Sequence, residues 1–250
     1  MVISIAMASS FERAYRKNRQ RKILVISAGG ETSGIQGLYF LSSGDSWEII
    51  SHASVPYPSK IGSLIETCKR QAVTSADLAW LDYKVTLLFA ECARATLAAV
   101  PRALRKPNMA VVNQLALFKG TVGEHVPLRS WNIALGDPRF LAGSIDVPVL
   151  SDFSRYSLLA GGDGSLPALS GNLIIARRFS GFVIFLNIGL ITHMTVIDRA
   201  SSRSILDSDT GPGMCLINRC AQGTNSVDGF DRDGSETAGG TVDKIGRAHV

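Results

Sequence analysis

The sequence predicts an α/β protein in which three short strands followed by a helix occur twice. Strand-length apolar segments separated by turns rich in Gly and Ser predict the first three strands at 23–27, 37–41 and 47–54. Apolar residues at helical spacing predict the helix that follows at 59–72. The second set is predicted at 182–186, 194–197 and 204–206, with its helix at 214–220. This repeated order indicates an internal structural duplication, although few residues are identical between the copies.

The segment between the two sets contains further elements. Val85, Leu88, Phe89 and Cys92 form one apolar stripe that predicts a helix over 83–100, which Pro101 would end. Strands are expected at 109–118 and 147–150 and a helix at 173–178, and within the second set a turn is expected at 187–189. We expect a basic disordered tail at 1–22, a first domain at 23–170 and a second, incomplete domain at 171–243.

Charge and composition exclude several classes of protein. The chain has 250 residues, 46% of them apolar, and a net charge of +5 that lies within residues 1–22. The remaining residues carry 20 cations and 20 anions, so the body has no excess positive charge for a nucleic-acid partner. No apolar run approaches the roughly 20 residues of a membrane span, and four cysteines predict buried free thiols. These features predict a cytoplasmic protein that binds neither nucleic acid nor membrane.

Duplicated β-β-β-α units are typical of the ribonuclease-H-like fold of actin, Hsp70 and sugar kinases, in which ATP lies between two such domains. The turn between the first two strands of each copy contacts phosphate through backbone N–H groups, which favours glycine. The residues expected to bind the ATP phosphates are Gly29, Gly30, Ser33, Gly34, Gly189, Gly211 and Gly213.

Asp209 begins the most specific string of the chain, Asp-Thr-Gly-Pro-Gly, between a predicted strand and a predicted helix. A carboxylate at a strand end that faces a cleft can act as a general base. The alternative is that Asp209 caps the helix that follows. The spacing alone does not decide between these two roles.

Seven strings, in the same order along the chain, resemble motifs of the anhydro-N-acetylmuramic acid kinase family, which has this fold. They are LFAEC at 88–92, LGDP at 135–138, PVLSDF at 148–153, AGGDG at 160–164, LNIG at 186–189, DTGPG at 209–213 and FDRDG at 230–234. The resemblance covers about residues 23–243, and its specificity comes from the shared order of the strings.

The resemblance implies an enzyme that uses ATP and water to open the 1,6-anhydro bridge of the sugar and to phosphorylate O6. It assigns the general base to Asp209 and implies sugar contacts at Thr121, Gly136 and Asp137. Mg²⁺ would offset the charge of the phosphates, and no residue is assigned as a metal ligand. The implied partners are the anhydrosugar and ATP, with a homodimer left open. Levoglucosan is an alternative substrate, and a catalytically dead binding module is an alternative function.

The sequence also departs from the family pattern at polar positions. In the first phosphate turn, Ser33 and Gln36 replace acidic residues, and Glu31 replaces a small hydroxyl residue. His193 replaces an Asn after the second turn, where we interpret a lone His as packed or solvated in preference to ligand-binding. Residues 244–250, KIGRAHV, resemble a translated sequencing adapter and are expected to be an artefact, with the second domain ending early.

Overall fold

The computed structural model describes residues 20–29, 34–43, 46–70, 72–121, 130–161, 166–223, 231 and 234–241. The chain divides into two compact units, Met1–Leu166 and Pro167–Val250. Most of the predicted basic tail, the predicted adapter segment and two residues of the first phosphate turn, Gly30 and Ser33, lie outside the described residues.

The first unit is built on a mixed sheet with the order β3-β2-β1-β4-β7. Its strands are β1 (Arg21–Ala28), β2 (Ile35–Ser43), β3 (Ser46–Val55), β4 (Met109–Asn113) and β7 (Val149–Leu150). β1, β2 and β3 form an antiparallel meander, whereas β4 pairs with β1 in parallel and β7 pairs with β4 in parallel. The predicted α/β class is therefore confirmed, with a sheet that contains both parallel and antiparallel pairs.

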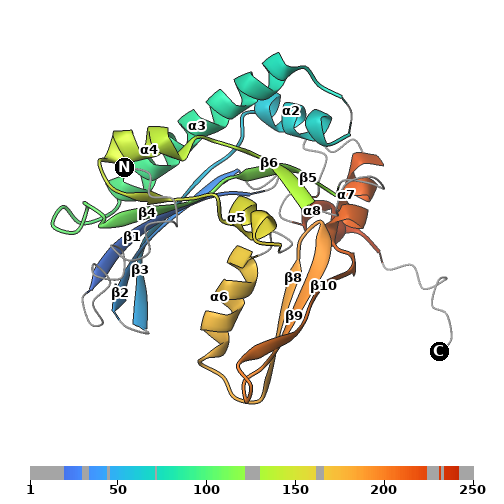
Figure 1. Cartoon of the computed structure of the whole chain (residues 1–250). Helices are drawn as coiled ribbons and strands as arrows, with labels where there is room; N and C mark the ends of the chain where they lie inside the picture. The colour runs from blue at the N-terminus through green and yellow to red at the C-terminus, as the bar shows by residue number, and fades with distance from the viewer. Residues whose placement is uncertain are drawn as a thin grey trace. The chain divides into compact units, whose positions relative to one another are not determined.

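The long helix α3 (Ser75–Ala98) covers one face of this sheet, and α2 (Ser59–Arg70) packs beside α3, as Figure 1 shows. The predicted apolar stripe of α3 is buried against the strands. α3 begins eight residues before its predicted start because Thr74 and Asp77 form a capping box. Gly37 in β2 lets α3 approach closely, since a Cβ there would overlap the side chains of Thr96 and Cys92.

The region predicted as one strand at 109–118 is two strands, so that prediction is wrong. β4 ends at Asn113, and β5 (Leu115–Thr121) leaves the main sheet to pair with β6 (Ser130–Leu135). The helices α4 (Pro138–Ile145) and α5 (Phe153–Leu159) complete the described elements of this unit. None of the described helices is long and apolar enough to cross a membrane.

The second unit contains an antiparallel sheet with the order β10-β9-β8. Its strands are β8 (Phe182–Ile188), β9 (Ile191–Asp198) and β10 (Arg203–Pro212), and its helices are α6 (Leu166–Ala176), α7 (Met214–Gly223) and α8 (Ser235–Gly239). Figure 1 shows α6 running alongside this sheet, and Asn172 of α6 donates a hydrogen bond to Thr195 of β9.

The turn between β8 and β9 is at Gly189 and Leu190, later than predicted, because Asn187 and Ile188 remain in the strand.

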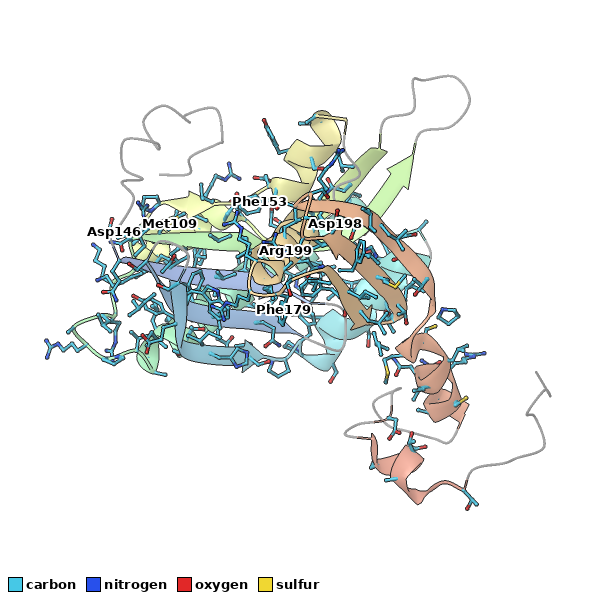
Figure 2. The ribbon with its side chains drawn as sticks, turned by 90° about the horizontal axis from the view of Figure 1, so that it is seen from below. Met109, Asp146, Phe153, Phe179, Asp198 and Arg199 are labelled. Atoms are coloured by element: carbon cyan, nitrogen blue, oxygen red, sulfur yellow. The ribbon has the colours of Figure 1, made fainter. Side chains whose placement is uncertain are left out.

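The hairpin turn between β9 and β10 is fixed by Asp198, which Figure 2 shows with Arg199 at this end of the strands. The Asp198 carboxylate accepts hydrogen bonds from the backbone N–H groups of Ala200 at 2.9 Å and Ser201 at 3.3 Å. Such a side-chain-to-backbone turn sets where β10 begins. A bulge between Ser204 and Leu206 then shifts the pairing by one residue, which brings Asp207 opposite Thr195 and Asp209 opposite His193.

The cysteine prediction is only partly right. Cys92 is buried beneath the main sheet, but Cys68 and Cys215 are half-buried and Cys220 is exposed. All four thiols are free. Burial raises the pKa of the Cys92 thiol, which makes this thiol a poor nucleophile near neutral pH.

Candidate active site

Asp209 lies near the end of β10, directly opposite His193 of β9. The Oδ1 atom of Asp209 is 2.9 Å from Nδ1 of His193, and the Asp209 side chain is 70% exposed. The carboxylate is therefore held from one side and open to solvent on the other.

The alternative role of Asp209 as a helix cap is wrong. α7 begins only at Met214, whose backbone N–H donates to the carbonyl of Gly189 at 2.8 Å. The next backbone N–H, of Cys215, donates to the carbonyl of Leu190 at 3.3 Å. The first turn of α7 is thus satisfied by the β8–β9 turn, without the Asp209 carboxylate.

His193 also contacts a second carboxylate. Its Nε2 atom is 3.1 Å from Oδ1 of Asp207, which accepts a hydrogen bond from the Thr195 hydroxyl at 2.6 Å. Asn172 of α6 donates in turn to that hydroxyl at 3.0 Å. The hydrogen bonds to Asp209 and then to Asp207 raise the pKa of His193 above its ordinary value. His193 is therefore packed between two carboxylates, and only the description of it as a lone residue is wrong.

The second predicted phosphate turn lies against the end of the DTGPG string. Gly213 donates its backbone N–H to the carbonyl of Leu190 at 3.0 Å, and a Cβ at position 213 would overlap the carbonyl oxygen of Gly189. Gly211 has a φ of +146°, a conformation that L side chains rarely adopt, and open space where its Cβ would stand. The structure therefore brings Gly189, Gly211 and Gly213 together in the second unit.

The first phosphate turn is described only at its two ends. The backbone N–H of Gly29 donates to the carbonyl of Gly34 at 2.9 Å, which closes the turn. Gly34 has a φ of +65°, and a Cβ there would overlap the backbone of Val55. Glycine at 34 is thus required by the fold, whatever ligand the turn binds. Its role in phosphate binding stays a prediction.

The residues expected to contact sugar lie in the first unit, where two of them support the fold. The N–H of Gly136 donates to the Asp82 carboxylate at 2.7 Å, and a Cβ there would overlap the Phe89 ring. Asp137 caps α4 and forms an ion pair with Arg139 at 2.7 Å. The Arg139 hydrogen bond lowers the pKa of Asp137 below its ordinary value. Thr121 is the last residue of β5, and its sugar contact stays a prediction.

Further polar residues gather at the carboxyl ends of the parallel strands, an edge where open α/β sheets bind ligands. Asn113 ends β4, and its amide donates to the Ser27 hydroxyl of β1 at 3.2 Å. Asp152 follows β7 with a φ of +63° and lines a small pocket with Asn113 and Gln114. None of these residues was singled out from the sequence, although Asp152 lies within the PVLSDF string.

A family model for anhydro-N-acetylmuramic acid kinase matches residues 21–247.

The chain belongs to the anhydro-N-acetylmuramic acid kinase family.

Members of this family are kinases, and the recognition made from the seven strings is confirmed.

Individual relatives agree with this assignment. A protein named anhydro-N-acetylmuramic acid kinase from Pseudomonas syringae pv. tomato is 28% identical over 222 residues, which cover 87% of this chain and 57% of that protein. Its namesake from Shewanella baltica is 28% identical over 228 residues, covering 88% and 58%. The one from Methylorubrum populi is 36% identical over 129 residues, covering 51% and 33%. The chain thus spans little more than half the length of the first two relatives.

The kinase family uses ATP, and of the three glycines expected to bind phosphate in the second unit, Gly211 is the one with open space beside its backbone. The N–H groups of Gly213 and Met214 already bond to the β8–β9 turn. Both ring nitrogens of His193 face carboxylates, which leaves no ring lone pair for a metal. In the part of the chain that the structure describes, no group of three or more acidic, His or Cys side chains is arranged to hold a metal ion.

Proposed function

We propose that the chain is an ATP-dependent kinase that opens the 1,6-anhydro bridge of anhydro-N-acetylmuramic acid and phosphorylates O6. Family membership supports this function. The observation that carries it is the contact of Gly213 with the Gly189 turn, because it joins the string that contains Asp209 to a turn expected to bind phosphate.

Asp209 is the proposed general base. The oxygen of a water molecule forms a bond to the anomeric carbon, and the bond between that carbon and O6 breaks. Asp209 takes the proton that the water loses. O6 then forms a bond to the γ-phosphorus of ATP, and ADP leaves. The exposed side chain of Asp209 supports this role, since water and sugar can reach it. Mg²⁺, when bound with ATP, would offset the phosphate charge.

The proposed fold is a duplicated ribonuclease-H-like domain, with domains at 23–170 and 171–243. The same strand order in the two antiparallel meanders supports this fold. The first unit has the order β3-β2-β1, and the second has the corresponding order β10-β9-β8. In each unit, a helix follows the third strand of the meander, α2 after β3 and α7 after β10.

One experiment tests the function directly. The chain is incubated with ATP, Mg²⁺ and 1,6-anhydro-N-acetylmuramic acid, and the products are followed by ³¹P NMR. We expect a sugar 6-phosphate resonance to grow as ADP forms. Levoglucosan in a parallel sample tests the alternative substrate. An unchanged ATP spectrum with both sugars would overturn the proposal.

Gln36 favours a second candidate, a binding module that keeps the fold without phosphoryl transfer. Gln36 stands where the family pattern has an acidic residue, and its amide donates to Ser54 at 2.8 Å while its carbonyl lies 3.0 Å from Nε2 of His52. This neutral side chain is thus used in contacts between β2 and β3. Calorimetric binding of ATP in a sample that yields no phosphorylated sugar would establish this candidate in place of the first.

A further inference from the structure

Polar side chains form one row across the three-stranded sheet of the second unit. Asp209 of β10, His193 of β9 and Asn187 of β8 lie directly opposite one another in the strand register. Two residues further along each strand, Asp207 lies opposite Thr195. Side chains in register across neighbouring strands lie on the same face of a sheet. His193 therefore stands on the same face as both Asp207 and Asp209.

The two contacts of His193 determine its protonation state. A carboxylate can only accept hydrogen bonds, so each ring nitrogen must carry a proton to bond to one. Nδ1 lies 2.9 Å from Asp209, and Nε2 lies 3.1 Å from Asp207. Both bonds are made together only by the imidazolium form. The cluster of two carboxylates and one imidazolium then carries one net negative charge instead of two.

A continuous set of hydrogen bonds connects a buried anchor with an exposed carboxylate, and both Thr195 and His193 donate to Asp207 between them. Asn172 donates to Thr195, whose side chain is 1% exposed, and Thr195 donates to Asp207, whose side chain is 18% exposed. His193, at 29% exposure, bonds to Asp207 and then to Asp209, at 70% exposure. Among the described residues, Oδ2 of Asp209 has no hydrogen-bond partner, whereas Oδ1 is held.

We propose that protonated His193 is a positioning residue that holds Oδ1 of Asp209 and leaves Oδ2 directed to the substrate water. This inference rests on the proposed function, in which Asp209 is the base. An exposed Asp on a strand edge would otherwise rotate freely about its side-chain bonds, and the bridge through His193 ties it to the buried anchor at Thr195. The imidazolium also offsets carboxylate charge close to the turn at Gly189, where phosphate is expected.

The proposal predicts that kcat depends on the protonation of His193, and few titratable residues surround this ring. Asp207 and Asp209 are the titratable side chains in contact with His193. Neither β8 nor α6 contains a titratable residue, and α7 contains Cys215, Arg219 and Cys220, none with a described contact to His193. When the pH rises through the raised pKa of His193, the ring loses one proton and one of its two bonds must break.

The first experiment observes the histidine itself in the ¹⁵N-labelled chain. Two-bond ¹H–¹⁵N correlation spectra are expected to show both ring nitrogens of His193 protonated at neutral pH. In Asp209→Asn and Asp207→Asn, the titration midpoint should move to lower pH. His52, which bonds to the amide of Gln36, is the internal control and should not respond. A neutral His193 at neutral pH, or a midpoint unchanged in both variants, would overturn the inference.

The second experiment measures turnover of His193→Asn, which keeps a polar side chain without the charge. We expect kcat to fall by about ten- to hundredfold with little change in KM for ATP, as for a misplaced catalytic group. In the parent chain, kcat should decline at alkaline pH as His193 loses its proton, and this decline should be absent from His193→Asn. Asp146→Asn, at the exposed C-cap of α4 in the first unit, is the control and should keep the parent profile. An unchanged kcat and pH profile in His193→Asn would overturn the inference.

The two failures are distinguishable. A chain that shows no turnover with any anhydrosugar contradicts the proposed function. The NMR titration does not depend on turnover, so it decides independently whether an imidazolium bridges the two carboxylates.

Discussion

Replacing Asp209 with Asn separates catalysis from stability, because the Asp209 side chain contributes little to the free energy of unfolding. The side chain is 70% exposed, and its described partner is His193. Exposed ion pairs contribute about 0–1 kcal/mol to the free energy of unfolding. A loss of that size lowers the Tm of a chain this long by no more than about 4 °C. Loss of a general base, in contrast, lowers the rate by about 10²–10⁴-fold.

The assay measures the rate of ADP release and the Tm on the same preparation of Asp209→Asn. We expect a folded variant that binds ATP nearly as the parent does and has lost phosphorylation of the sugar. Ser208→Ala, the preceding residue on the strand, is the control and should keep most of the activity. A variant that melts several degrees lower and turns over normally would refute the assignment of Asp209 as the base.

Three further predictions concern the packing and the charge at the sites. Gly136→Ala places a Cβ at a φ of +97° and against the Phe89 ring, so urea unfolding should show a free energy of unfolding lower by about 2–4 kcal/mol. The control Gly143→Ala, in α4, places its Cβ in open space and should raise the free energy of unfolding by up to about 1 kcal/mol. Equal effects of the two substitutions would contradict this expectation. Gly213→Ala should push the Gly189 turn away and weaken calorimetric ATP binding by roughly tenfold, about 1.4 kcal/mol, and an unchanged Kd would count against a role for this junction. Because the pKa of His193 is raised in the folded protein, the stabilisation by its protonated ring is present below the ordinary His pKa of about 6.5 and is lost as the pH rises through the folded value. The difference in free energy of unfolding between the parent and His193→Asn should therefore shrink from acidic to alkaline pH. A difference that grows with pH would contradict a raised pKa.

Most of the strands could be predicted because their patterns are local. β1, β2 and β3 lie within two residues of the predicted segments, since apolar runs bounded by Gly and Ser mark both ends. The division of 109–118 into β4 and β5 could not be predicted, because the apolar run continues while the pairing partner changes from β1 to β6. A sequence run records hydrophobicity and contains no signal for its partner.

The site shows the same limit. Asp209 could be singled out because DTGPG is a local string with Gly residues at defined positions. The role of His193 depends on the register of β9 with β10 and on a helix, α6, that precedes β9 by many residues. Polar residues at every second position of β9, His193 and Thr195, were the available signal. Only the strand pairing shows that their partners are carboxylates.

In the proposed reaction, Asp209 activates a water molecule that becomes part of the sugar. The most direct test runs the reaction of the chain in ¹⁸O-labelled water with ATP, Mg²⁺ and 1,6-anhydro-N-acetylmuramic acid, and locates the label by mass spectrometry soon after mixing. We expect ¹⁸O on the anomeric carbon of the sugar 6-phosphate, an unlabelled phosphoryl group, and no labelled sugar from Asp209→Asn. Label in inorganic phosphate, with the sugar unchanged, would contradict it.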